Sequence, residues 1–64
     1  MNIELINYDN GESYTEINDA TSSQISAYSN STVIRFNGEE FHVMAVVMDV
    51  INNCVEIHIS ENEP

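Results

Sequence analysis

Hydrophobic and polar residues alternate most clearly between residues 32 and 60, and this segment predicts three consecutive antiparallel strands. Asn37-Gly38 separates the first two strands. This pair favours a two-residue type I′ hairpin, because both central residues of that turn need φ > 0. The turn predicts one apolar cross-strand pair and one ion pair among the facing residues, which are Phe36 and Glu39, Ile34 and Phe41, and Arg35 and Glu40.

The connection to the third strand follows from the alternation of Val55, Ile57 and Ile59 with polar neighbours. A two-residue turn at Asn52-Asn53 would place these apolar residues on the face opposite the one that the first hairpin defines. A three-residue loop, 51–53, or a bulge in the middle strand removes this conflict. We favour the loop. It predicts a core face made of Ile34, Phe36, Phe41, Val43, Ala45, Val47, Val55, Ile57 and Ile59.

The middle strand carries further apolar residues on its other face, which are Met44, Val46, Met48 and Val50. A strand that is apolar on both faces needs cover on both sides. So short a chain has material for only one of them. We therefore expect a homodimer with these four residues in the interface, although the helix and the dimer could exchange faces.

The N-terminal segment NIELINY reads as a strand, and residues 9–12 turn the chain. If Asn10-Gly11 closes a hairpin, Leu5 faces Glu16 and Asp9 faces Glu12, which are unhelpful and repulsive pairs. If a helix follows, Ser13-x-x-Glu16 forms a capping box. We favour the helix.

The expected helix covers residues 13–28, and its apolar stripe runs through Ile17, Ala20, Gln24 or Ile25, and Ala27 or Tyr28. Thr21-x-x-Gln24 is a second capping box, so the helix could begin as late as Ser22, and residues 13–28 could be partly strand. The predicted fold is α+β: an N-terminal strand, one short helix and a three-stranded antiparallel meander, with the helix packed on one sheet face. Residues 1–64 form one domain, and 61–64 are expected to be a frayed tail.

Charge narrows the choice of partner. The chain has eleven Asp and Glu residues against a single Lys or Arg, and its net charge is −10. Such a surface repels nucleic acid and anionic membranes and attracts basic proteins, although acidity can also serve solubility alone. The single cysteine excludes an internal disulfide, and the N-terminus has no signal-peptide pattern, so we expect a cytoplasmic protein.

The residues that could carry chemistry do not form a site in this pattern. Cys54 and His58 lie about 13 Å apart along a strand, too far for two ligands of one zinc ion, and His42 lies at the far end of the neighbouring strand. The acidic surroundings would raise the pKa of the Cys54 thiol, which opposes its use as a nucleophile. We expect neither an enzyme nor a metal or cofactor site.

The carboxylates are spread along the whole chain. Acids at alternate positions of one strand lie roughly 7 Å apart, comparable with the spacing of phosphates along a DNA strand. A dimer would present two such arrays to a basic DNA-binding protein, which recognises DNA largely through phosphate charge. The acids expected to bind the partner are Glu4, Asp9, Glu12, Glu16, Asp19, Glu39, Glu40, Asp49, Glu56 and Glu61.

In its size, its near-absence of Lys and Arg, its spread carboxylates and its β-rich segment from Val33 to Ile59, the chain resembles the small acidic DNA-mimic proteins that phages make against host DNA-binding proteins. It looks most like the dimeric phage host-takeover inhibitors of the bacterial nucleoid protein HU. The resemblance is one of composition and covers the whole chain. It implies competitive inhibition of HU in the host cytoplasm, with a DNA-repair enzyme, a restriction enzyme or a CRISPR nuclease as other possible targets.

The alternative hypothesis is a small acidic structural or accessory protein of a phage or bacterium. Its acidity would then serve solubility only, and it would act through the apolar Met44–Val50 face.

Overall fold

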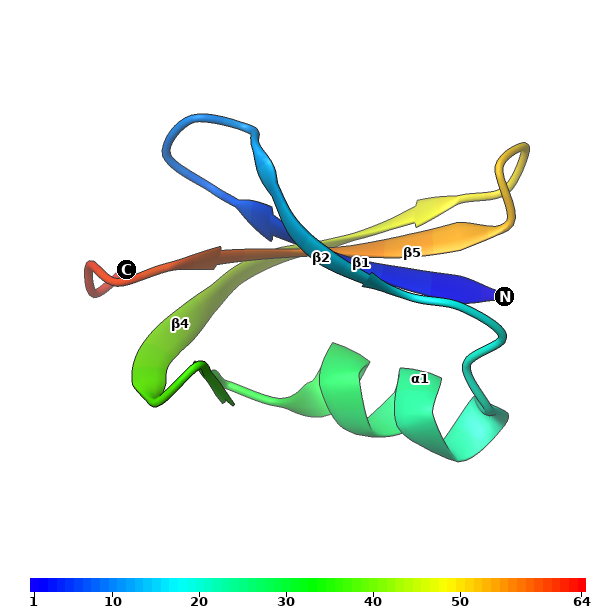
Figure 1. Cartoon of the computed structure of the whole chain (residues 1–64), viewed down its shortest axis with the longest axis horizontal. Helices are drawn as coiled ribbons and strands as arrows, with labels where there is room; N and C mark the ends of the chain where they lie inside the picture. The colour runs from blue at the N-terminus through cyan, green and yellow to red at the C-terminus, as the bar shows by residue number, and fades with distance from the viewer.

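The computed structural model describes residues 1–64 and contains five strands and one helix (Figure 1). In chain order these are β1 (Asn2–Asn7), β2 (Ser13–Ile17), α1 (Ser22–Asn30), β3 (Val33–Phe36), β4 (Glu39–Asp49) and β5 (Cys54–Ser60). All five strands belong to one sheet with the order β2-β1-β5-β4-β3. The central pair, β1 and β5, is parallel, and the other three pairs are antiparallel.

This architecture corrects the predicted fold class. The protein is mostly sheet, with 52% of its residues in strands that form a curled, mixed half-barrel. The prediction of a three-stranded antiparallel meander with a helix packed on it is therefore wrong. Its main error is at residues 13–17, which form β2 instead of the start of the helix.

β2 and β1 form a hairpin in a register that avoids the unfavourable pair of Leu5 with Glu16. Leu5 faces Thr15 rather than Glu16, because the loop is longer than two residues and the register shifts between Leu5 and Ile6. The amide of Gly11 donates to the carbonyl of Asn7 over 2.7 Å, with Gly11 at φ 77°. Leu5 is only 3% exposed, and residues 13–17 pair with the strand that contains it. This pairing outweighs the local preference of the Ser13 capping box for a helix.

The core lies along the parallel pair at the centre of the sheet. Ile3 faces Val55 and Leu5 faces Ile57, and all four side chains are at most 3% exposed. The buried cluster consists of Ile3, Leu5, Ala20, Ile34, Phe41, Val55, Ile57 and Ile59. We call the sheet face that carries it the core face, and the opposite face the outer face.

α1 begins where the second capping box predicts. The Thr21 hydroxyl accepts from the Gln24 amide over 3.1 Å, and the Gln24 side-chain oxygen accepts from the Thr21 amide over 2.9 Å. The helix contains no buried residue, and only Ile25 and Tyr28 pack partly against the core. Its nine residues are too few for a membrane-spanning helix.

The β3–β4 hairpin confirms the prediction from Asn37-Gly38. Both residues have positive φ, 51° and 79°, as a type I′ turn requires. Ile34 faces Phe41 and Arg35 faces Glu40 in the expected register.

The β4–β5 connection corrects the preferred three-residue loop. Asp49 pairs with Cys54 across the four residues 50–53, and the register shifts between Val43 and Ala45, so that Met44 is the extra residue of a bulge. A bulge in the middle strand is the other solution that the alternation allows. It moves Ala45 and Val47, predicted for the core, to the outer face, where they pair with His58 and Glu56.

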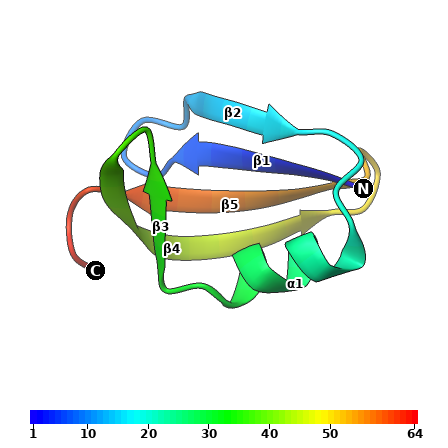
Figure 2. The ribbon, with the colours of Figure 1, turned by 60° about the horizontal axis from the view of Figure 1, so that its bottom comes forward.

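The sheet curls so strongly that β3 crosses in front of the central strands (Figure 2). The β1–β2 loop, the β3–β4 turn and the C-terminus lie at one end of the molecule, and the β4–β5 loop lies at the other.

Candidate functional site: an acidic sheet face

Three glutamates lie side by side across the outer face. Glu4 of β1 pairs with Glu16 of β2 on one side and with Glu56 of β5 on the other. Directly paired residues on neighbouring strands point to the same face with their Cβ atoms about 5 Å apart. The three carboxylates therefore form one row across three strands.

This row is unfavourable for folding alone. Like charges directly opposite each other destabilise a sheet by roughly 0.2–1 kcal/mol per pair. No lysine or arginine lies within ion-pairing distance of the row, because Arg35 pairs instead with Glu40, 2.8 Å away on β3–β4. The row is thus not neutralised by a lysine or arginine, and its one basic neighbour is His58, which lies 3.0 Å from Glu56 and carries charge only when protonated.

Asp49 joins the row to form a set around Cys54. Burial raises the pKa of the Cys54 thiol, and the nearby charges of Glu4, Glu16, Glu56 and Asp49 raise it further. The thiol is only 9% exposed and stays protonated at neutral pH, so it is not an activated nucleophile. We call Glu4, Glu16, Asp49 and Glu56 the outer-face set.

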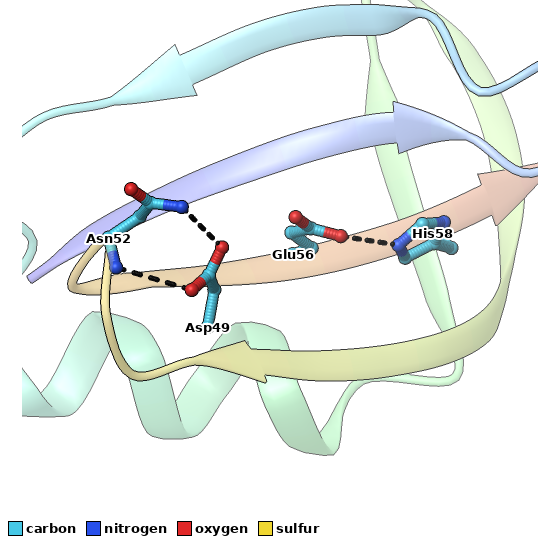
Figure 3. Close-up of polar contacts among 4 residues, drawn as sticks. All are labelled: Asp49, Asn52, Glu56 and His58. Atoms are coloured by element: carbon cyan, nitrogen blue, oxygen red, sulfur yellow. Dashed lines mark hydrogen bonds and ion pairs between the residues drawn. The ribbon is translucent and has the colours of Figure 1, made fainter.

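Two members of this set are held in place by polar neighbours (Figure 3). Oδ2 of Asp49 accepts from the side-chain amide of Asn52 over 2.7 Å, and Oδ1 accepts from the Asn52 backbone amide over 3.2 Å. These bonds lower the pKa of Asp49. Oε1 of Glu56 lies 3.0 Å from Nε2 of His58, two residues along β5. Both carboxylates therefore have restricted orientations on the face.

A second group of acids gathers at the end of the molecule where the β1–β2 loop, the β3–β4 turn and the C-terminal residues meet. Its members surround Tyr14, whose pKa is raised first by burial and then by the charges of these acids. The pKa of Glu61 is raised by a side-chain hydrogen bond that its protonated carboxyl donates to Glu39, and further by the charge of Glu39. The Ser60 hydroxyl at the end of β5 donates to Asp9 over 2.8 Å and so links β5 to the β1–β2 loop. The group, which we call the end set, consists of Asp9, Glu12, Glu39 and Glu61.

The structure thus brings eight of the ten acids predicted for partner binding into two sets. Glu40 is engaged by Arg35, and Asp19 lies in the turn before α1 at φ 53°, so neither belongs to a set. Glu4, Asp49 and Glu56 are half-buried, and the other predicted acids are exposed. The sequence could not predict the row, because it depends on the pairing of β1 with both β2 and β5.

The four residues predicted for the dimer interface do not share one face. Val46 and Met48 pair with core residues Ile57 and Val55, Met44 is the bulge residue, and Val50 lies in the β4–β5 loop. Val47, which the sequence placed in the core, is 44% exposed, and Ile51 is 94% exposed. Five of the seven large apolar residues that are exposed therefore lie in the C-terminal half of β4 and the loop that follows it, and the other two are Tyr8 and Val33.

The structure contains no pocket and no group of three or more His, Cys, Asp or Glu residues placed to hold a metal ion. No family model, no curated protein and no solved structure matches the chain.

Proposed function

We propose that the protein is a non-catalytic DNA mimic, which competitively inhibits a basic DNA-binding protein, with a nucleoid protein of the HU type as the first target to test. The observation that carries the proposal is the row of Glu16, Glu4 and Glu56. Three carboxylates on adjacent strands, with no lysine or arginine to offset them, destabilise the sheet, and a polycationic partner would remove that cost.

The charge density of the molecule supports this role. A net charge of −10 on a body whose longest extent is 29 Å amounts to roughly one charge per 3 Å of length. One DNA strand carries one phosphate per about 3.4 Å of helix axis, which is a similar value. A DNA-binding surface that neutralises phosphates with Lys and Arg would meet a similar density of carboxylates on this protein.

The mechanism needs no chemistry beyond ion pairing. Lysine and arginine side chains of the target pair with the outer-face set, and the occupied groove cannot take up DNA. Because the attraction rests on many exposed charges, and salt screens exposed charges over about 8 Å at physiological ionic strength, the affinity falls steeply as salt increases.

A competition experiment tests the proposal. Fluorescently labelled duplex DNA is bound to purified HU in low-salt buffer, and the acidic protein is titrated in while anisotropy is recorded. We expect full displacement at low salt and a dissociation constant that rises at least about tenfold between 50 and 200 mM NaCl. Failure to displace DNA at low salt would refute HU as the target. The same titration with a DNA-repair enzyme, a restriction enzyme or a CRISPR nuclease extends the test to the wider class.

Two charge-matched variants locate the binding surface. The first replaces Glu4, Glu16 and Glu56 by Gln, and the second replaces Glu12, Glu39 and Glu61 by Gln, so each removes three negative charges. We expect the first variant to lose most of its inhibition and the second to keep most of it. Equal losses would mean that the net charge, rather than the row, provides the affinity.

A second candidate function rests on the exposed apolar residues. Val50 and Ile51 are 80% and 94% exposed at the β4–β5 loop, an arrangement found at protein interaction sites. The protein would then be a structural or accessory component that acts through this surface. A pull-down from bacterial lysate separates the two: DNA-binding proteins that elute with salt support the mimic, and assembly components that resist salt support the alternative.

A further inference from the structure

The C-terminal half of β4 has a neighbouring strand on one side only. Residues 44–49 follow the pairing of β4 with β3, which ends at His42, and they pair only with β5. None of the backbone hydrogen bonds outside the helix and sheet ladders involves these residues. Their N–H and C=O groups that point away from β5 are therefore free, and the segment is an open sheet edge.

Apart from the bulge at Met44, where the segment begins, this edge lacks the features that usually protect an exposed strand. Residues 44–48, Met-Ala-Val-Val-Met, contain no charge and no proline. Val46 and Met48 on the core face are 43% and 53% exposed, and Val47 on the outer face is 44% exposed. The other edge strands differ, because β2 carries Glu16 and β3 carries Arg35. Figure 1 shows that α1 does not cover this edge, since the end of β4 and the β4–β5 loop diverge from the helix.

We propose that this edge of β4 pairs with the same edge of a second copy of the chain, antiparallel and about a two-fold axis, so that the two half-barrels join into one continuous sheet. This proposal is independent of the proposed function. It differs from the face-to-face dimer expected from the sequence, because strand-to-strand backbone hydrogen bonds form its centre.

A second copy fits this edge because the segment is self-complementary. An antiparallel two-fold pairing keeps core face beside core face. With Val47 at the axis, Val46 lies opposite Met48 of the second copy, and Ala45 lies opposite Asp49 of the second copy. Apolar side chains then meet on both faces, and no carboxylate lies directly opposite another.

The charge of the two copies does not prevent this pairing. Asp49 is the only carboxylate inside the paired segment, and the two copies of Asp49 lie four positions apart along it, about 13 Å by strand rise and beyond the screening length of about 8 Å. Glu56 lies on β5, one strand away from the edge, so the two copies of Glu56 are separated by both β4 strands. The end set lies at the end of the molecule remote from the β4–β5 loop (Figure 2). The longest extent of the chain, 29 Å, is several times the screening length of about 8 Å at physiological ionic strength. Added salt should therefore strengthen the association of two copies, whereas it weakens the binding of a cationic target.

Sedimentation equilibrium of the full chain tests the proposal. We expect a mass of twice 7.2 kDa at high protein concentration, with a dissociation constant that falls as NaCl is raised. Val47→Lys and Val47→Glu should each weaken the dimer by about tenfold or more, because each places like charges opposite one another at the axis. An equimolar mixture of the two variants should restore dimers, since Lys and Glu then face each other.

Val33→Lys is the matched control, because Val33 is also 44% exposed but lies on β3. It should leave the dimer unchanged. A monomer at all concentrations, an unaffected dimer in both Val47 variants, or no restoration on mixing would overturn the proposal. A different result would assign the edge to a cationic partner. In that case no dimer forms, the Val47→Glu variant binds a basic protein more tightly, and the Val47→Lys variant binds it more weakly. The HU competition experiment tests only the proposed function, and the sedimentation experiment tests only the dimer. Either proposal can therefore be refuted without the other.

Discussion

The rings of Tyr14 on β2 and Phe36 on β3 lie with their centroids 5.9 Å apart, although these strands are the two opposite edges of the sheet. Tyr14 also lies 5.3 Å from Phe41, which belongs to the core. Tyr14 reaches these rings because it is the extra residue at the register shift between β1 and β2. The curl of the half-barrel is thus closed by aromatic contact between strands that share no hydrogen bonds.

We expect Tyr14→Ala to destabilise the fold by about 2 kcal/mol, from lost apolar burial and lost aromatic pairing. Urea denaturation followed by circular dichroism measures the change. Tyr8→Ala is the control, because Tyr8 belongs to the same hairpin region but is 52% exposed. A loss as large for Tyr8 as for Tyr14 would contradict closure by the aromatic cluster.

Glu4 lies between two carboxylates, so Glu4→Gln should stabilise the protein at pH 7 and low salt by about 0.5 kcal/mol. The gain should shrink as NaCl screens the repulsion. The same variant should inhibit the target less strongly. Thermal melts at two salt concentrations and the DNA competition assay measure both effects. A Glu4→Gln variant that neither gains stability nor loses inhibition would show that the row does not bind the target.

Glu61 gives a pH dependence with a defined sign. Its pKa is raised by the hydrogen bond and charge of Glu39, so the folded state takes up this proton at higher pH than the unfolded state does. The contribution of Glu61 to stability is therefore present at acidic pH and is lost as pH rises through the raised pKa. Glu61→Gln should raise the melting temperature at pH 7 and leave it almost unchanged at pH 3.

Glu63→Gln provides the reference for this measurement, since it removes an exposed acid from the same segment.

Asp49 should affect stability with the opposite dependence on pH. Its pKa is lowered by Asn52, so its contribution is present at neutral pH and is lost as pH falls through that lowered value. Asn52→Ala should therefore destabilise the protein at pH 7 and not at pH 2.

The two capping boxes in the sequence can be compared directly. Thr21→Ala should cost about 1 kcal/mol, because it removes the acceptor for the Gln24 amide at the start of α1. Ser13→Ala should change the free energy of unfolding much less, because Ser13 is exposed at the start of β2. Equal losses would indicate that residues 13–16 have helical structure in solution.

The parts of the fold that the sequence predicted correctly are local. Asn37 and Gly38 determine a turn whose register needs no information from elsewhere in the chain. Thr21 and Gln24 likewise cap the helix with their own side chains. In both cases the interacting residues are at most three positions apart.

The errors come from bulges and from long-range pairing. The extra residues Tyr14 and Met44 each change which side chains face the core, and alternation alone could not locate either bulge. The Ser13-x-x-Glu16 pattern is a valid local helix signal, but pairing with β1 overrides it. The carboxylate row of Glu16, Glu4 and Glu56 was unpredictable for the same reason, because it requires β1 to lie between β2 and β5.

The parallel pairing of β1 with β5 also determines how the chain can fold. The three hairpins of the chain, β1–β2, β3–β4 and β4–β5, can form early, because each closes a short loop. Ile3 meets Val55 only after nearly the whole chain has been brought together. The most deeply buried layer is consequently the one with the greatest sequence separation. Folding should be slow for a chain of this size. We expect the rate-limiting step to be the pairing of the first strand, β1, with the last strand, β5, at the centre of the sheet.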